Sequence, residues 1–230
     1  MKFDFTKVVF TGDSLVDEKI NQKFDSHISD GSVNSLVPYE QWDSGCHWCY
    51  MLSRVFNFEY VNTAIGGEKI MNICNSYINS RILNYNPTFV FIDGGVNDIF
   101  NGISVSNTTN YMTQTIQTLL NKGIQVGLVW FPVTHSSMAS LVSSYATMAN
   151  TFKNNYPNQF IYFNFEGATN FGSTSSNSAD IPQDYRRDGL HFNQAGYKAT
   201  AEYIIQKMIE ADDTLVDSRA GGASSVIIRG

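Results

Sequence analysis

Four short segments of this chain contain the residue types that an acyl-transfer reaction needs. They are Gly12-Asp13-Ser14-Leu15, Asn62-Thr63-Ala64-Ile65-Gly66-Gly67, Gly95-Val96-Asn97-Asp98 and Asp188-Gly189-Leu190-His191. A serine hydroxyl becomes an effective nucleophile only when a nearby base takes its proton. We therefore predict Ser14 as a nucleophile and His191 as its base. Asp188 comes one helical turn before His191, and we predict that its carboxylate holds the imidazole in the required tautomer.

The same segments offer donors for the charge that develops during such a reaction. Attack on an acyl carbon places negative charge on the former carbonyl oxygen, and each fixed donor around it typically contributes ~3 kcal/mol. We predict three donors: the backbone N–H groups of Ser14 and Gly67, and the side-chain amide of Asn97. Nucleophile, base, acid and oxyanion hole are then all accounted for.

Taken singly, each segment also has a structural interpretation. Ser14 and Asn97 could cap helices, Gly66-Gly67 could form a turn, and His191 could be a solvated or core histidine. All four segments, however, end a predicted strand or begin a predicted helix. Their order and positions favour the catalytic interpretation.

With these four blocks the chain resembles the SGNH hydrolases, also called the GDSL esterase and lipase family, from about residue 7 to residue 208. The resemblance assigns the same residues to the same roles. The family's second block has the pattern Asn-x-Ala-x-x-Gly, which selects Gly67 rather than Gly66 as the donor. Val96 departs from the small or polar residue that is more frequent before the asparagine, and we expect this to alter local packing only.

The elements that must position these residues alternate along the chain. Strands are predicted near residues 6–11, 58–62, 88–93, 124–131 and 159–164, and helices at 46–56, 68–83, 107–122, 138–155 and 193–209. Short, almost continuously apolar strands between helices predict an α/β fold, a three-layer α/β/α sandwich around a mostly parallel five-stranded sheet. Such sheets bind ligands at the carboxyl ends of their strands, which is where Ser14, Gly67 and Asn97 fall.

Composition excludes some classes of function. The formal net charge is −6 and the pI is near 5.1, without a cluster of Lys and Arg, which argues against binding of nucleic-acid phosphates. No apolar run approaches the ~20 residues that span a bilayer. The chain as given shows no signal peptide, which means that an export signal was removed or that none is used. The location is left open between the cytoplasm and a virion or larger extracellular assembly. Residues 1–210 are predicted to form one domain, and 211–230 an extension, a linker or an appended strand.

The cysteines raise a second possibility. Cys46 and Cys49 form a Cys-His-Trp-Cys sequence, which could indicate redox chemistry or a metal. A second ligand pair is not apparent, and the favoured interpretation places them on a helix as small core residues, with a local disulfide left open. Trp48, between them, is expected in the core. We expect neither metal nor cofactor, because the serine mechanism needs no Lewis acid.

The substrate is predicted from the long polar segment at residues 19–45, which we expect to overhang the site. Its aromatic and polar residues favour sugars, with Trp42 as a candidate wall of a sugar subsite. We therefore predict a serine esterase that removes an acyl group, foremost acetyl, from a carbohydrate or glycan. A lipase or thioesterase for longer acyl chains and a catalytically silent glycan-binding module of a viral tail protein remain alternatives, and the oligomeric state is left open.

Overall fold

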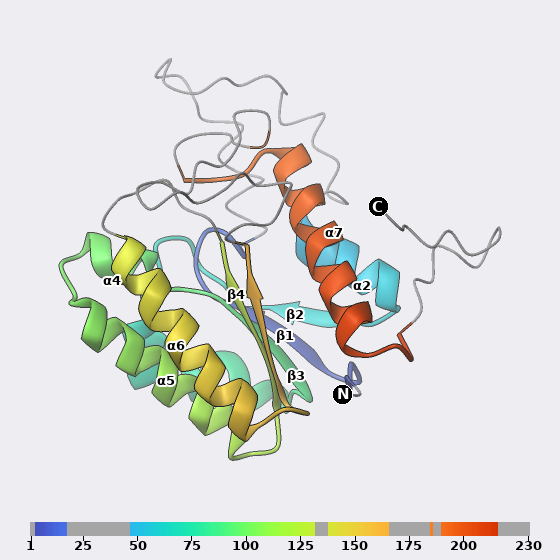
Figure 1. Ribbon diagram of the computed structural model, residues 1–230, viewed down its shortest axis with the longest axis horizontal. Helices are drawn as coiled ribbons and strands as arrows, with labels where there is room; N and C mark the ends of the chain where they lie inside the picture. The colour runs from blue at the N-terminus through green and yellow to red at the C-terminus, as the bar shows by residue number, and fades with distance from the viewer. Residues whose placement is uncertain (1–2, 18–46, 132–137, 166–184, 186–189, 216–230) are drawn as a thin grey trace.

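A five-stranded parallel sheet runs through the middle of the molecule (Figure 1). The computed structural model describes residues 3–17, 47–131, 138–165, 185 and 190–215. The strands are β1 (Val8–Thr11), β2 (Tyr60–Asn62), β3 (Phe89–Ile92), β4 (Gln125–Trp130) and β5 (Phe160–Asn164). They lie in the order β2-β1-β3-β4-β5, and every neighbouring pair is parallel. Because all strands point the same way, their carboxyl ends share one edge.

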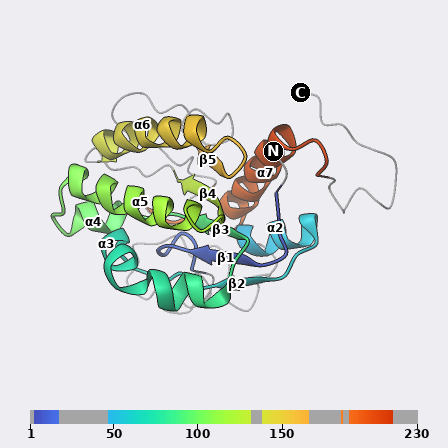
Figure 2. The same ribbon diagram turned by 90° about the horizontal axis from the view of Figure 1, so that it is seen from below.

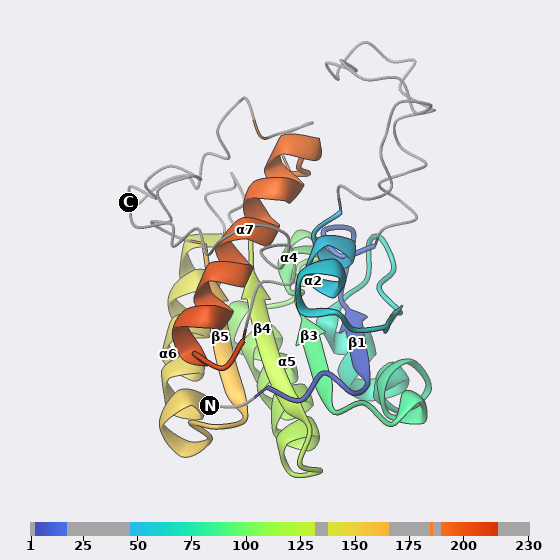
Figure 3. The same cartoon turned by 90° about the vertical axis from the view of Figure 1, so that its right-hand side faces the viewer.

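Helices cover both faces of this sheet. In chain order the helical elements are α2 (Trp48–Phe56), α3 (Ile70–Asn72), η3 (Ile73–Ile82), η4 (Leu83–Tyr85), α4 (Val96–Phe100), α5 (Val105–Leu120), α6 (Ala139–Asn155) and α7 (Gln194–Ala211). The view from below separates the layers: α2 and α7 lie on one side of the sheet, and α3, α5 and α6 on the other (Figure 2). In the side view α7 crosses in front of the strands with α2 beside it (Figure 3).

The apolar character of the strands explains why they are buried between these layers. The central strands β1 and β3 are buried at every position, which matches their sequences VVFT and FVFI. Across them, the rings of Phe10 and Phe91 stack with their centroids 4.7 Å apart. Trp48 is fully buried as expected, and its indole N–H donates to the carbonyl oxygen of Leu15 at 3.1 Å, which fastens α2 to the segment that follows β1.

The predicted three-layer sandwich is confirmed, and the sheet is parallel throughout. One helix differs from its prediction. The sequence predicts one regular helix over residues 68–83, whereas the structure has a short α3 that continues into η3 with the wider hydrogen-bonding pattern of a π-helix. This stretch is rich in Asn and Ser, which are weak helix formers, so a regular α-helix has little local advantage there.

The end of α7 ties the carboxyl side of the domain to its beginning. The carboxylate of Asp212 accepts a hydrogen bond of 2.9 Å from the backbone N–H of Phe3. The domain therefore includes residues just past the predicted boundary at residue 210, and the extension from residue 216 onward lies outside the described residues. Within the described part of the chain, no helix combines the length and apolarity needed to cross a membrane.

Candidate active site

Ser14 lies in a tight turn directly after β1. The carbonyl oxygen of Asp13 accepts hydrogen bonds from the N–H groups of Val16 at 3.1 Å and Asp17 at 3.0 Å, so the chain reverses around the serine. The Ser14 hydroxyl lies 2.9 Å from Nε2 of His191, although the two residues are far apart in sequence. This distance allows the imidazole to take the hydroxyl proton directly.

His191 is held in place by the residues that follow it. Phe192 is fully buried, and Asn193 begins α7 by accepting a hydrogen bond of 3.0 Å from the N–H of Gly196. The N–H of Asn193 donates in turn to the carbonyl oxygen of Tyr185 at 3.0 Å. His191 therefore lies two residues before the cap of a long helix that packs on the sheet. Asp188, the predicted acid, lies outside the described residues and stays a prediction.

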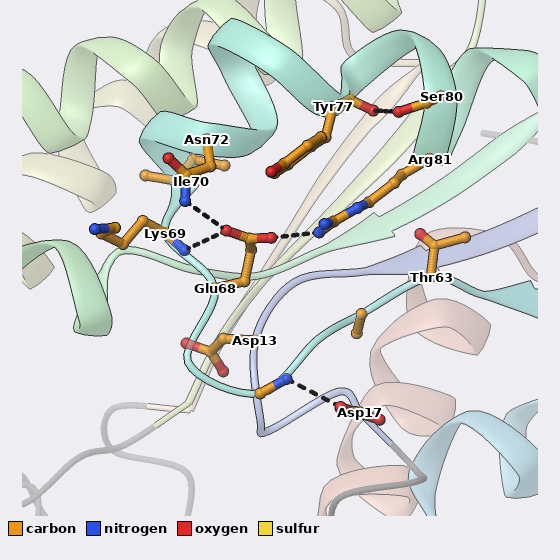
Figure 4. Close-up of polar contacts among 12 residues, drawn as sticks. Asp13, Asp17, Thr63, Glu68, Lys69, Ile70, Asn72, Tyr77, Ser80 and Arg81 are labelled. Atoms are coloured by element: carbon orange, nitrogen blue, oxygen red, sulfur yellow. Dashed lines mark hydrogen bonds and ion pairs between the residues drawn. The ribbon is translucent and has the colours of Figure 1, made fainter.

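The second block supplies a candidate oxyanion donor. The N–H of Gly66 donates to Oδ2 of Asp17 at 2.9 Å, so it is already engaged (Figure 4). Gly67 has a φ of +78°, in the left-handed region that glycine tolerates, and its N–H has no acceptor among the described residues. Of the two glycines, Gly67 is therefore the one whose N–H has no acceptor among the described residues, and its role as an oxyanion donor stays a prediction.

Asn97, the third predicted donor, occupies a more crowded position. Its side-chain nitrogen lies 3.1 Å from Oδ2 of Asp13 and 3.1 Å from the carbonyl oxygen of Glu68. An amide nitrogen carries two hydrogens, and both point to protein acceptors here. Donation to a substrate oxygen therefore requires Asn97 to share or release one of these bonds. The sequence did not predict these two contacts, which join the first three blocks.

The carboxylate of Asp98 anchors the loop that carries Gly67. Its oxygens accept hydrogen bonds from the backbone N–H groups of Ile70 at 2.8 Å and Met71 at 3.1 Å, where α3 begins. Burial raises the pKa of Asp98 above its ordinary value, and the two N–H donors oppose part of that effect. A carboxylate at a helix beginning satisfies N–H groups that the helix itself leaves unpaired. In the sequence, the feature that could have pointed to Asp98 is its position next to Asn97.

Glu68 sits at the centre of a polar cluster behind the same loop (Figure 4). Its carboxylate forms an ion pair with Arg81 and accepts hydrogen bonds from the side chain of Asn72 at 2.8 Å and the N–H of Lys69 at 3.1 Å. The guanidinium of Arg81 also lies 3.8 Å from the ring centroid of Tyr77. Burial alone would raise the pKa of Glu68, but the bonds from Asn72 and Arg81 hold it below its ordinary value.

This cluster matters to the site because it fixes the backbone of Glu68. That residue follows Gly67 directly, and its carbonyl oxygen is one of the two acceptors for Asn97. The cluster was not predicted, because no pattern in the sequence marks Glu68 and Arg81 as partners. Trp42, the predicted wall of a sugar subsite, lies outside the described residues.

The structure thus combines a three-layer α/β/α architecture around a parallel sheet with a serine and a histidine in contact at the carboxyl edge of that sheet. The chain belongs to the GDSL-like lipase/acylhydrolase family, whose model matches residues 10–199. A search among curated proteins found no match.

Solved structures share the fold at low sequence identity. The psychrotrophic esterase EstA from Pseudoalteromonas is 14% identical with a TM-score of 0.60, over 89% of this chain and 97% of its own. An acetylxylan esterase from Geobacillus stearothermophilus is 13% identical with a TM-score of 0.60, over 90% of this chain and 95% of its own. The acetyl xylan esterase AlAXEase is 18% identical with a TM-score of 0.60, over 88% of this chain and 100% of its own.

Proposed function

We propose that this protein is a serine esterase that removes acyl groups, foremost acetyl, from a carbohydrate or glycan. The observation that carries the proposal is the distance of 2.9 Å between the Ser14 hydroxyl and Nε2 of His191, in a chain of the GDSL-like family. Both groups lie at the sheet edge where parallel α/β folds bind their ligands. The Gly67 N–H, which has no acceptor among the described residues, is proposed to donate to a substrate oxygen.

The proposed reaction proceeds in two half-reactions. His191 takes the proton of Ser14 as the serine oxygen attacks the acyl carbon, and the oxyanion is stabilised by the Gly67 N–H, the Ser14 N–H and the Asn97 amide. The imidazolium then gives its proton to the departing sugar hydroxyl, which leaves an acyl-serine. Water, activated by the same imidazole, hydrolyses this ester and restores the free serine. Asp188 is proposed to orient the imidazole throughout.

Two observations support a carbohydrate ester as the substrate. Acetyl xylan esterases are among the proteins that share this fold, and the segment at residues 19–45 carries Trp42 among polar residues suited to hydroxyl groups. A lipase would be expected to show a broad apolar lid instead. A strong preference for octanoate over acetate esters would favour the lipase or thioesterase alternative.

The deciding experiment compares wild type, Ser14→Ala and Ser140→Ala in hydrolysis of p-nitrophenyl acetate and of acetylated xylan. Ser140 is an exposed residue of α6, so its variant controls for the loss of a hydroxyl. We expect turnover in wild type and Ser140→Ala and none in Ser14→Ala, with circular dichroism confirming that all three fold. Equal turnover in wild type and Ser14→Ala would overturn the proposal. An absence of turnover on both substrates by folded wild type would favour the silent glycan-binding module.

A further inference from the structure

Two carboxyl groups are buried against each other beneath the nucleophile turn. Asp13 is 1% exposed and Asp93, at the end of β3, is 3% exposed. The backbone N–H of Asp13 donates to Oδ1 of Asp93 at 3.1 Å, and the two side chains are also within hydrogen-bonding reach of each other. Within the described part of the chain, neither carboxyl group forms an ion pair with a lysine or an arginine.

Such a pair cannot carry two negative charges at neutral pH. Like charges in a buried site repel strongly, so the pair retains a proton that the two groups share. The hydrogen bonds indicate where it resides. The side chain of Asp13 accepts from the N–H of Leu15 at 3.0 Å and from the Asn97 amide, whereas Asp93 accepts only from the N–H of Asp13 among the described residues. Asp13 accepts more hydrogen bonds than Asp93, which favours the ionised form of Asp13, so the proton belongs on Asp93.

The backbone is shaped to allow this contact. Gly12 has a φ of +147°, and a Cβ atom added there would lie 1.7 Å from Oδ1 of Asp93. Any residue with a side chain would displace the carboxyl group. Burial and the charge of Asp13 also raise the pKa of Asp93 well above its ordinary value, which agrees with the assignment from hydrogen bonds.

The protonation state of this pair determines which way the Asn97 amide points. An ionised Asp13 only accepts hydrogen bonds, so it binds the NH₂ side of the amide. A protonated Asp13 could instead donate to the amide oxygen and stabilise the flipped side chain. The flipped amide would turn its oxygen toward the carbonyl of Glu68 and would have no N–H to offer the oxyanion beside Gly67.

We propose that Asp93 is a positioning residue whose carboxylic acid donates to Asp13 and keeps Asp13 ionised. The ionised Asp13 holds the Asn97 amide with its NH₂ group, rather than its oxygen, toward Asp13 and the Glu68 carbonyl, so that an N–H can be shared with the oxyanion. This role rests on the proposed esterase function, because it acts through a donor of that reaction. Asp93 itself touches neither the substrate nor the reacting atoms.

The test uses the full chain with three substitutions at Asp93. In Asp93→Asn the amide N–H replaces the acidic proton, so kcat should stay within about threefold of wild type. In Asp93→Leu the donor to Asp13 is gone, and kcat should fall at least ~10-fold with KM within about twofold, a fraction of the ~10²–10³ that loss of a whole oxyanion donor costs. Asp93→Ala, which also offers no donor, replaces the Leu variant if thermal melting shows that the latter is unfolded at the assay temperature. Asp213→Leu, at an exposed position, is the matched control and should leave kcat unchanged.

A double-mutant cycle separates positioning from general damage. If Asp93 acts through Asn97, Asp93→Leu should cost less than about twofold in an Asn97→Ala background. An equal loss in both backgrounds, or a loss in Asp93→Asn as large as in Asp93→Leu, would overturn the inference. A folded wild type without esterase activity would instead count against the proposed function, so the two failures are distinguishable.

Discussion

Two buried acidic regions meet at Asn97, and they neutralise their charge in different ways. On one side, Glu68 is ionised and paired with Arg81, with further bonds from Asn72 and Lys69. On the other side, Asp13 and Asp93 bond to each other and to backbone or amide donors, without a lysine or arginine partner among the described residues. The first region presents a backbone carbonyl to Asn97, and the second presents a carboxylate.

Because of this difference, we expect the two regions to have different roles. A carbonyl held by an ion pair has a fixed position but no titratable state. A carboxylate that accepts from a neutral acid can itself become protonated, and its hydrogen bonds then change. We therefore expect substitutions in the Glu68 region to act mainly on stability, and substitutions in the Asp13 region to act on both turnover and pH dependence.

The largest expected effect comes from substituting the proposed nucleophile or base, whose reaction both regions support. Ser14→Ala and His191→Ala should each lower kcat by at least ~10⁴, and the double variant should lose little more, because the pair acts as one unit. Steady-state rates on p-nitrophenyl acetate measure this. Losses that multiply in the double variant would show that Ser14 and His191 act independently. The two regions would then not support a single catalytic pair.

The next largest effect tests the point where the regions meet. Asn97→Ala should lower kcat by ~10²–10³ with little change in KM, because the lost interaction forms in the transition state. Single-substrate kinetics with acetate and butyrate esters would check that the loss is the same for both. A variant with a raised KM and an unchanged kcat would indicate that Asn97 binds the ground state and that both regions serve substrate binding.

A smaller effect is expected from breaking the ion-paired region alone. Arg81→Met leaves the Glu68 carboxylate buried without its cation and should lower the free energy of unfolding by about 2–3 kcal/mol, less than for a fully buried pair because Arg81 is partly exposed. Urea denaturation measures it, with the exposed Lys122→Met as a matched control. Adding Glu68→Gln should recover part of the loss, since the unpaired charge is then absent. A double variant less stable than Arg81→Met would contradict the charge argument.

The sequence predicted the framework because its signals are local. Each predicted strand overlaps an observed one, since a short apolar run between turns is enough to indicate a buried parallel strand. The contact between Ser14 and His191 was predicted from block order, although no local rule brings the two residues together. The roles of Asp188 and Trp42 stay predictions, because these residues lie outside the described part of the chain.

The two acidic regions could not be predicted in the same way. Asp13 and Asp93 come from different strand ends, and in the sequence each looks like an ordinary polar residue at a turn. Glu68 and Arg81 are joined through the wide turns of η3, which the sequence predicted as a regular helix. Contacts that depend on how loops converge, or on the winding of a helix, leave no periodic signal.

The last expected effect is on the pH dependence of stability, and it contrasts the two regions most directly. Asp93 has a raised pKa in the folded state, so the free energy of unfolding that it contributes is lost as pH rises above the ordinary carboxyl range of ~4. Glu68 has a lowered pKa, so its contribution is present above that range and lost as pH falls through the folded value. Asp93→Asn should therefore gain stability relative to wild type as pH rises from 4 to 8, by up to ~1.4 kcal/mol per pH unit.

Glu68→Gln should show the opposite trend, with a deficit that is constant at neutral pH and shrinks as pH falls below the ordinary carboxyl range of ~4. Urea denaturation of wild type and both variants at each pH gives the two differences directly. Among the described residues, Asp93 interacts electrostatically with Asp13 and with the hydroxyl of Tyr145. Neither of these residues is substituted in the two variants. A difference between Asp93→Asn and wild type that stays constant with pH would show that Asp93 is ionised in the folded state. The two regions would then neutralise charge alike, and the proton could not be what orients Asn97.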